Sequence, residues 1–277
     1  MKKVNSNIPY DYVTVKTTRS RIEKGLLAIP VSLIDLFPKN SSQLLIIDEQ
    51  GNEGIKSFTP YNSSSRECRI GGMREFYSKY NIKDGEELVI QLLDDAKFKI
   101  LPERLFTEQV TQLEKILEHS PTEEDSKILI EKISRVVNKK PIEVVIGEYS
   151  RMATSEILER KKVAKTSPTV SESVPSSLRR ILLEIYQGKC QVTQFTFLTK
   201  NATPYFELHH IDPSKGNHFK NLLVVSANVH AQFTFANVIQ EFDENNWLRK
   251  VKFNGEKHTV YQAIDKIKIE YFKEVHQ

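Results

Sequence analysis

Cysteine and long apolar runs are both scarce in this sequence. The chain has 277 residues but only two cysteines, Cys68 and Cys190, which lie far apart. Two cysteines exclude a disulfide framework and a zinc site built from four thiolates. No apolar run approaches the roughly 18 residues of a membrane-spanning helix. No apolar stretch follows the basic start at Lys2 and Lys3, so a signal peptide is not predicted. We therefore expect a cytoplasmic protein with no membrane partner.

An excess of charge of one sign is also nearly absent. The chain has 40 Lys and Arg against 36 Asp and Glu, a net charge of +4. This balance permits nucleic-acid binding without requiring it, because the clustering of basic residues matters more than their total. One cluster lies at residues 16–24, with four basic residues and one acid. It indicates either contact with phosphate or an ordinary solvated surface.

The first 105 residues are rich in short strand patterns. Apolar alternation or short apolar runs predict strands that include residues 43–47, 87–93 and 97–101, and helical spacing predicts short helices at 31–37 and 73–80. This pattern favours a small barrel. Spacings of three and four then predict helices within 105–145, and a stretch rich in Ser, Thr and Pro predicts a linker. We predict an α+β chain with four parts: a β-rich domain at 1–105, a helical bridge at 106–165, a linker at 166–177 and a second domain at 178–277.

The last third of the chain brings histidines close together in the sequence. We predict a helix at 178–186, strands at 206–211 and 222–225, and a helix at 227–242 that begins after Ser226. His209 and His210 would end the first strand, and His230 would lie in the first turn of the last helix. Imidazole is both a transition-metal ligand and a base that titrates near neutrality. Hydrolysis of a phosphodiester with one metal ion needs both properties.

The same residues carry a resemblance to a known family. Gly188-Lys189-Cys190, Glu207-Leu208-His209-His210-Ile211-Asp212-Pro213, Asn221-Leu222-Leu223-Val224-Val225 and His230 resemble the HNH nucleases, whose fold is a ββα-metal finger. The resemblance implies that His210 is the general base that activates water. It implies that His209 and His230 bind one divalent cation per active site, and that Asn221 braces the loop between the strands.

Two details of this resemblance bear on the metal. The family implies Mg²⁺, whereas two neutral imidazoles suit Mn²⁺, Ni²⁺ or Zn²⁺ better. Many HNH domains also hold a structural zinc with two Cys-x-x-Cys pairs, but here Cys190 is followed by Thr193, so no structural zinc is expected. We expect apolar packing to hold the finger instead. The candidate packing residues are Phe195, Phe197, Phe206, Phe233 and Phe235. His218 is expected in a solvated loop or against phosphate.

Residues 25–38 and 69–88 resemble a second family, the DNA-binding pseudobarrel of plant B3 transcription factors and several restriction endonucleases. The resemblance implies two arms, at 17–24 and 62–69, that grip the major groove. Arginine can read guanine and asparagine can read adenine, whereas serine and lysine contact phosphate. The alternative is that these are ordinary polar loops. The candidate base-reading residues are Arg19, Arg21, Asn62, Arg66 and Arg69, and the candidate phosphate contacts are Ser20, Lys24, Ser63 and Ser64.

A sequence-reading module joined to a phosphodiester-cleaving module is typical of a type II restriction endonuclease. We therefore expect metal-dependent cleavage of double-stranded DNA at a short site, by a homodimer that supplies two active sites. The helical bridge would supply the dimer surface or pack on the barrel. Three alternatives stay open: a modification-dependent endonuclease that senses methyl- or hydroxymethylcytosine, a homing or mobile-element nuclease, and a DNA-binding regulator with an inactive HNH finger.

Overall fold

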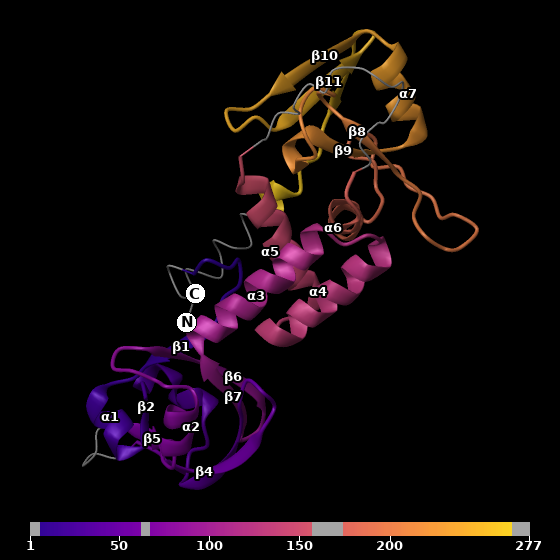
Figure 1. Cartoon of the computed structure of the whole chain (residues 1–277). Coiled ribbons are helices and arrows are strands. Elements are labelled where there is room, and N and C mark those ends of the chain that lie inside the picture. Colours follow the sequence, from indigo (N-terminus) through magenta and orange to yellow (C-terminus); the bar gives the residue numbers. More distant parts are fainter. Residues whose placement is uncertain (1–5, 62–66, 157–173, 268–277) are drawn as a thin grey trace, which may run out of the picture. The chain divides into compact units, whose positions relative to one another are not determined.

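The computed structural model describes residues 6–61, 67–156 and 174–267, and the chain divides into two compact units. The first unit comprises residues 1–113 and 135–138, and the second comprises residues 114–134 and 139–277. Two helices, α3 (Glu103–Glu118) and α4 (Glu123–Val137), contribute residues to both units. The mixed α+β class predicted from the sequence is confirmed. The predicted domain boundaries stay predictions, and each unit is described by itself (Figure 1).

A seven-stranded sheet dominates the first unit. Its order is β1 (Val13–Lys16), β6 (Glu87–Asp94), β7 (Lys97–Pro102), β3 (Ser42–Ile47), β4 (Glu53–Thr59), β5 (Cys68–Ile70) and β2 (Leu27–Ile29). The pairs are antiparallel except β3 with β7, which runs parallel. The sheet is mostly antiparallel, and several neighbouring strands are not consecutive in the sequence. This topology is consistent with a pseudobarrel. Helices α1 (Arg19–Lys24) and α2 (Arg74–Lys79) and the 3-10 helix η1 (Val31–Leu36) complete the unit.

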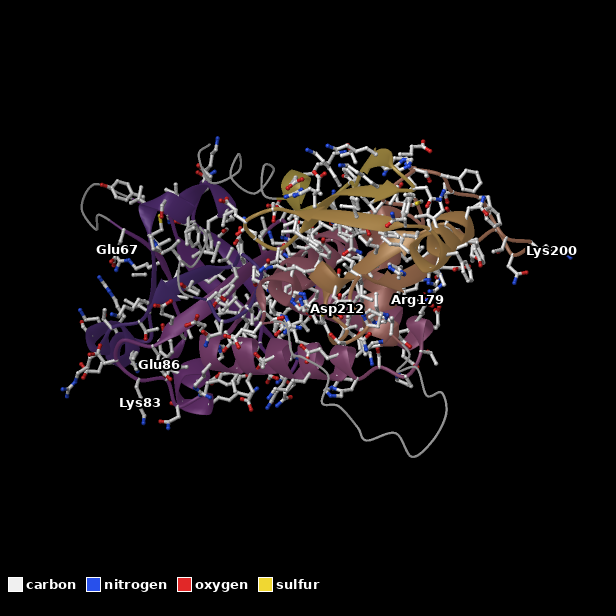
Figure 2. The ribbon with its side chains drawn as sticks, turned by 90° about the horizontal axis from the view of Figure 1, so that it is seen from above. Glu67, Lys83, Glu86, Arg179, Lys200 and Asp212 are labelled. Atoms are coloured by element: carbon white, nitrogen blue, oxygen red, sulfur yellow. The ribbon has the colours of Figure 1, made fainter. Side chains whose placement is uncertain are left out.

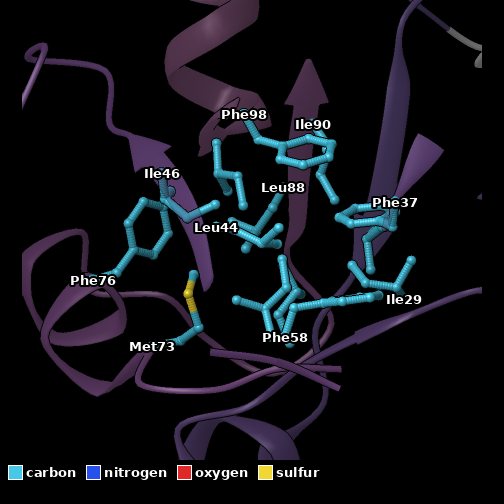
Figure 3. Close-up of a cluster of buried hydrophobic side chains, with 14 of the residues drawn as sticks. Ile29, Phe37, Leu44, Ile46, Phe58, Met73, Phe76, Leu88, Ile90 and Phe98 are labelled. Atoms are coloured by element: carbon cyan, nitrogen blue, oxygen red, sulfur yellow. The ribbon is translucent and has the colours of Figure 1, made fainter. Parts of the chain in front are cut away.

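Strand periodicity explains the core of this unit. In β3 the side chains of Leu44 and Ile46 are buried, while their neighbours are more exposed, because successive residues of a strand face opposite sides. The Phe37 ring stacks on Phe98, with centroids 4.5 Å apart, and also on Phe58, at 5.3 Å. Figure 3 shows these three rings in one cluster with Leu44 and Ile46. Cys68 and Ile70 of β5 belong to this cluster and Ile22 of α1 packs against it, so the core fixes both elements.

A glycine permits the turn from α1 into β2. Gly25 ends α1 in the left-handed region, with φ of 67°, and a Cβ at this position would lie 2.5 Å from Cγ of Arg74. Only a residue without a side chain accepts both conditions. The turn therefore places the basic helix α1 directly before β2.

The second unit contains a two-stranded hairpin, a three-stranded sheet and the helices around them. The hairpin pairs β8 (Glu207–His210) with β9 (Leu222–Val225), and η2 (Phe219–Asn221) precedes β9. The sheet has the order β10 (Val238–Phe242), β11 (Leu248–Phe253) and β12 (Glu256–Thr259). The helices are α5 (Pro141–Thr154), α6 (Ser176–Tyr186) and α7 (Ala227–Phe235), beside the parts of α3 and α4 given above. None of the helices within the described ranges is long and apolar enough to span a bilayer.

The predicted helix at 227–242 is wrong in its second half. Helix α7 ends at Phe235, and residues 238–242 form β10 instead, paired from Val238 opposite Phe253 onward. Asn237 and Asn254 are hydrogen-bonded to each other at the start of this pairing. The N–H of Asn254 donates to the carbonyl of Asn237, and the N–H of Asn237 donates to the side-chain oxygen of Asn254, both at 2.9 Å. The β-branched Val238 and Ile239 favour a strand once a partner strand is available. Strand β11 lies beyond a turn at Asn246, so the periodicity of residues 227–242 alone could not reveal it.

A buried carboxyl pair lies inside the second unit. Glu148 is fully buried and accepts two hydrogen bonds from Arg151, at 2.8 and 3.1 Å, and Arg151 also contacts Glu118 at 2.7 Å. Burial, and then the charge of Glu148, raise the pKa of Glu114 to about 8. Glu114 therefore carries a proton in the folded unit at neutral pH.

We predict that loss of the Glu114 proton at high pH makes the second unit less stable. The folded pKa of Glu114 lies above its ordinary value of 4.5, so its contribution is complete below pH 4.5 and is lost as the pH rises through 8. Between pH 5 and pH 9 the free energy of unfolding should fall by on the order of 2–4 kcal/mol. Trp247, the one tryptophan of the chain, is buried in this unit and reports its unfolding by fluorescence.

The matched variants are Glu114→Gln and Glu108→Gln. The first should remove most of the pH dependence, because glutamine does not titrate. Glu108 is an exposed residue of the same helix, so its replacement should leave the dependence in place. Equal pH profiles for the parent chain and Glu114→Gln would contradict the prediction.

Candidate functional site

The β8–β9 hairpin and helix α7 bring two of the predicted histidines together. His209, on β8, and His230, on α7, have ring centroids 5.2 Å apart. The His209 ring also stacks on Phe233, with centroids 4.2 Å apart. Burial, and then the neighbouring His230 and His210, lower the pKa of His209 to about 4. His209 is therefore a neutral imidazole at physiological pH, which is the form that binds metal ions.

Two side chains that the sequence reasoning left without a role hold His230. Glu207 accepts a hydrogen bond from Nδ1 of His230, so Nε2 is the nitrogen left for a ligand. Tyr205 Oη donates to the other oxygen of Glu207 at 2.5 Å. These bonds, first Tyr205 and then His230, lower the pKa of Glu207. The sequence did contain a signal for the contact between Glu207 and His230. Glu207 and His209 are two positions apart on one strand, so their side chains share the face on which His230 was expected to meet His209.

The ring of His210 turns toward the loop of the hairpin. Its Nε2 lies 2.8 Å from Oδ1 of Asn217, and because that oxygen accepts, Nε2 carries the proton. Nδ1 is then the nitrogen with a free lone pair. Asn217 was not predicted as a site residue, and its distance of seven positions from His210 carries no periodic signal.

Asn221 fixes the loop between the two strands. The side chain is 3% exposed. Its Oδ1 accepts from the backbone N–H of Asp212 at 2.9 Å, and its Nδ2 donates to the carbonyls of Asp212 and Gly216 at 3.0 and 3.1 Å. The amide thus satisfies three backbone groups of a polar loop and holds its ends together.

His218 has a structural role, so the expectation of a solvated or phosphate-contacting side chain is wrong. It is 7% exposed, its Nε2 donates to the carbonyl of Ser155 at 3.1 Å, and its Nδ1 accepts from the N–H of Lys220. Burial lowers its pKa. The sequence could not show this, because Ser155 lies far away along the chain.

The expected packing residues divide into two groups. Phe206 is buried, and Phe233 packs against the core cluster that contains Cys190 and Val251. Phe195, Phe197 and Phe235 are 56%, 48% and 86% exposed, so the prediction that they pack the finger is wrong. Cys190 is buried with a free thiol.

The histidine pair provides few of the ligands that a metal site needs. No three or more His, Cys, Asp or Glu side chains within 6–61, 67–156 and 174–267 are arranged to hold one ion together. His209 and His230 bring two imidazole rings side by side, and imidazole is a ligand for divalent transition-metal ions. Two imidazoles are fewer than the three protein ligands that catalytic zinc sites have, so a cation held here would need its other ligands from water or from a phosphate.

The predicted DNA-reading residues lie on α1 and β5 of the first unit, as far as they are described. Arg21 Nη2 contacts Glu67 Oε2 at 2.5 Å, and Arg69 Nε lies 3.8 Å from the other oxygen of the same carboxylate. The two side chains are about one third exposed. Glu67 thus gathers Arg21 and Arg69 into one cluster, a role that sequence reasoning missed.

The remaining candidates of this unit are more exposed. Arg19 is 83% exposed and pairs with Glu23 at 2.9 Å, one helical turn away. Ser20 and Lys24 are exposed on the same helix. The other predicted contacts lie outside the described residues, so nothing is said of their placement: Asn62, Ser63, Ser64 and Arg66.

Comparisons with known proteins found structural neighbours only. No protein-family model matches the chain, and no curated protein matches it. Arabidopsis FUS3, solved as a DNA complex, is 15% identical over 33% of this chain and 94% of its own, with a TM-score of 0.29. A hypothetical Arabidopsis thaliana protein is 17% identical over 32% and 86%, with a TM-score of 0.28. The N-terminal domain of Helicobacter pylori LlaJI.R1 is 12% identical over 32% and 77%, with a TM-score of 0.26. Likeness at this level carries no argument about function.

We predict that Asn221→Ala destabilises the second unit. The change removes three hydrogen bonds of a buried amide and leaves the N–H of Asp212 without its acceptor, which should cost about 2–4 kcal/mol. Denaturant unfolding followed by Trp247 fluorescence measures the loss. Asn201→Ala, at an exposed asparagine of the same unit, should change stability by less than about 0.5 kcal/mol. Equal losses in the two variants would show that the Asn221 amide does not hold the loop.

Proposed function

We propose that this chain is a metal-dependent endonuclease that cleaves double-stranded DNA at a short specific site, as a type II restriction endonuclease does. The observation that carries the proposal is the hairpin site, where His209 and His230 lie with ring centroids 5.2 Å apart and His210 follows directly on the same strand. Paired metal-binding nitrogens beside a base are what one-metal hydrolysis of a phosphodiester requires.

A divalent cation fits the two imidazoles, with Mg²⁺ implied by the family resemblance and Mn²⁺ or Ni²⁺ favoured by the nitrogen ligands. His209 and His230 would hold it, and Glu207 fixes the orientation of His230. When bound, the cation supplies positive charge that stabilises the negative charge developing on the phosphate. The protein keeps His209 neutral through burial, so this ligand does not need to lose a proton first.

His210 is the proposed general base. Its Nε2–H is engaged by Asn217, so Nδ1 can accept the proton of an attacking water. The same hydrogen bond fixes the ring orientation, and the amide of Asn221 fixes the loop that carries Asn217. Base, orienting partner and loop brace all belong to one hairpin.

Recognition of DNA is assigned to the first unit. Arg21 and Arg69 carry guanidinium groups of the kind that bind guanine edges bidentately. Glu67 holds both of them near one place, which reduces the conformational freedom lost on binding. Arg19, Ser20 and Lys24 on α1 are exposed and suit phosphate contact.

A homodimer is proposed because two active sites cut both strands of a short palindromic site. Helices α3 and α4 contribute the exposed apolar residues Ile116 and Ile128 in the second unit. Exposed apolar side chains on neighbouring helices are suited to a subunit interface.

A second candidate function is a DNA-binding regulator whose histidine site does not cut. The observation that favours it is that only two candidate ligands meet at the site, and no larger group does so among the residues described. The deciding experiment incubates the purified chain with unmodified and cytosine-methylated phage DNA and Mg²⁺ or Mn²⁺. Discrete fragments from unmodified DNA support restriction, cleavage of methylated DNA alone indicates modification dependence, and binding without cleavage indicates a regulator.

We predict that His210→Ala lowers the rate of DNA cleavage at least about 100-fold, because the water loses its base. Binding of the same DNA, measured by fluorescence anisotropy, should stay close to that of the parent. His119→Ala is the matched control, since His119 is exposed just after the end of α3 and is not one of the histidines of the site. A His210→Ala protein that cuts at the parent rate would disprove the assignment of the base.

We predict that Arg21→Ala weakens specific DNA binding by about 1–3 kcal/mol, the value of one bidentate base contact. Binding is measured against a DNA that the parent chain cuts and against a scrambled duplex. The loss should be larger for the cut site, because a base contact carries sequence information. Arg135→Ala, at an exposed arginine of α4, is the control. An equal loss on both duplexes would assign Arg21 to phosphate contact instead.

A further inference from the structure

Three large apolar side chains are exposed on one loop between α6 and β8. Phe195, Phe197 and Leu198 are 56%, 48% and 63% exposed. They belong to residues 194–204, here called the aromatic loop. Figure 1 shows this segment standing away from β8 and β9, and Figure 2 shows Lys200 at its far end. Exposed apolar residues that gather at one place usually mark a binding surface.

Backbone hydrogen bonds hold the aromatic loop in this conformation. The carbonyl of Phe195 accepts from the N–H of Cys190 at 2.9 Å, and the carbonyl of Phe197 accepts from Tyr205 at 2.9 Å. At the tip, Thr199 N–H donates to the carbonyl of Thr203 at 2.8 Å, and the two hydroxyl groups lie 2.7 Å apart. The loop is thus built as a short, hydrogen-bonded projection.

The base of the loop also fixes its direction. Gly188 has φ of 68°, and a Cβ there would lie 2.4 Å from Cβ of Pro204. This close contact is open only to glycine. The rings of Phe197 and Tyr205 stack with centroids 5.1 Å apart, and Phe195 follows at 6.0 Å from Phe197. The rings of Tyr205, Phe197 and Phe195 therefore form a row, in which the first pair is stacked and the second pair is tilted by 43°.

Tyr205 links this row of rings to the histidine site. Its hydroxyl donates to Glu207 at 2.5 Å, and Glu207 accepts from His230. The aromatic loop therefore rises directly beside the site where the scissile phosphate would lie.

The composition of the loop indicates the chemistry of its partner. Residues 194–204 contain no acid and one base, Lys200, and the other polar residues are Thr, Asn and Gln. This surface does not repel a polyanion, and its apolar groups match the faces of nucleobases. Proteins that bend or open duplex DNA insert Phe and Leu side chains between base pairs in this way.

We propose that Phe197 and Leu198, with Phe195 behind them, act as an apolar wedge that opens a base step of duplex DNA beside the histidine site. The proposal rests on the proposed function, because it requires that DNA is the molecule bound there. It adds a deformation of the duplex at the point of cleavage and assigns that step to the aromatic loop.

The test measures binding of the full chain, without divalent cation, to a duplex and to the same duplex with one central mismatched pair. A mismatched pair is easier to unstack, so a wedge protein binds it more tightly. The parent chain should prefer the mismatched duplex by at least about fivefold, the lower range for one aromatic–base stacking contact. Phe197→Ala/Leu198→Ala should lose this preference while its affinity for the matched duplex changes little.

Phe242→Ala is the matched control, because Phe242 is also 48% exposed but lies on β10, away from the aromatic loop. It should keep the preference, and Trp247 fluorescence should show that the variants unfold at the same denaturant concentration as the parent. If the double variant keeps the preference, or if the parent binds both duplexes equally, the wedge is disproved while DNA binding stands. A parent chain that binds neither duplex overturns the wedge and the proposed function together.

Discussion

The buried amide of Asn221 is the constraint on which the hairpin site depends. The loop between β8 and β9 is polar and, before η2, has no regular secondary structure, so its backbone groups need partners from elsewhere. One side chain supplies three of them, at Asp212 and Gly216. With the loop closed in this way, the strand that carries His209 and His210 ends at a defined point. Asn217 then lies within hydrogen-bond distance of His210.

Local periodicity was sufficient for most elements of the fold. The strands predicted at 43–47, 87–93 and 97–101 correspond to β3, β6 and β7, because alternation within a strand is a property of neighbouring residues. The helix predicted at 227–242 shows the limit of this reasoning. Residues 238–242 become a strand only because β11 pairs with them, and that pairing joins segments on the two sides of a turn. Sequence spacing within one segment contains no information about such a partner.

The candidate site shows the same division. His209, His210 and Asn221 could be singled out because their types and order are distinctive, and the structure brings His209 and His230 together. The contacts that orient the site side chains could not be found in this way. Asn217 at His210, and Glu67 at Arg21 in the first unit, act through a hydrogen bond and an ion pair that depend on tertiary distance, and only Glu207 had a signal, in the alternation along its strand. His218 was misjudged for the same reason, because its buried environment is created by Ser155, a residue remote in sequence.

Hydrogen bonds and apolar packing, rather than thiolates, hold the base of the aromatic loop. Gln191 is 1% exposed, and its backbone N–H donates to the carbonyl of Val224 while its side-chain oxygen accepts from the N–H of Val224 at 2.7 Å. Its amide nitrogen donates to the carbonyl of Tyr261 at 2.9 Å. One glutamine therefore joins the loop base to β9 and to the chain after β12. Because Gln191 follows the buried Cys190 directly, the loop leaves the core at a fixed point. Phe195 and Phe197 are therefore exposed by the geometry of the loop and not by a lack of structure.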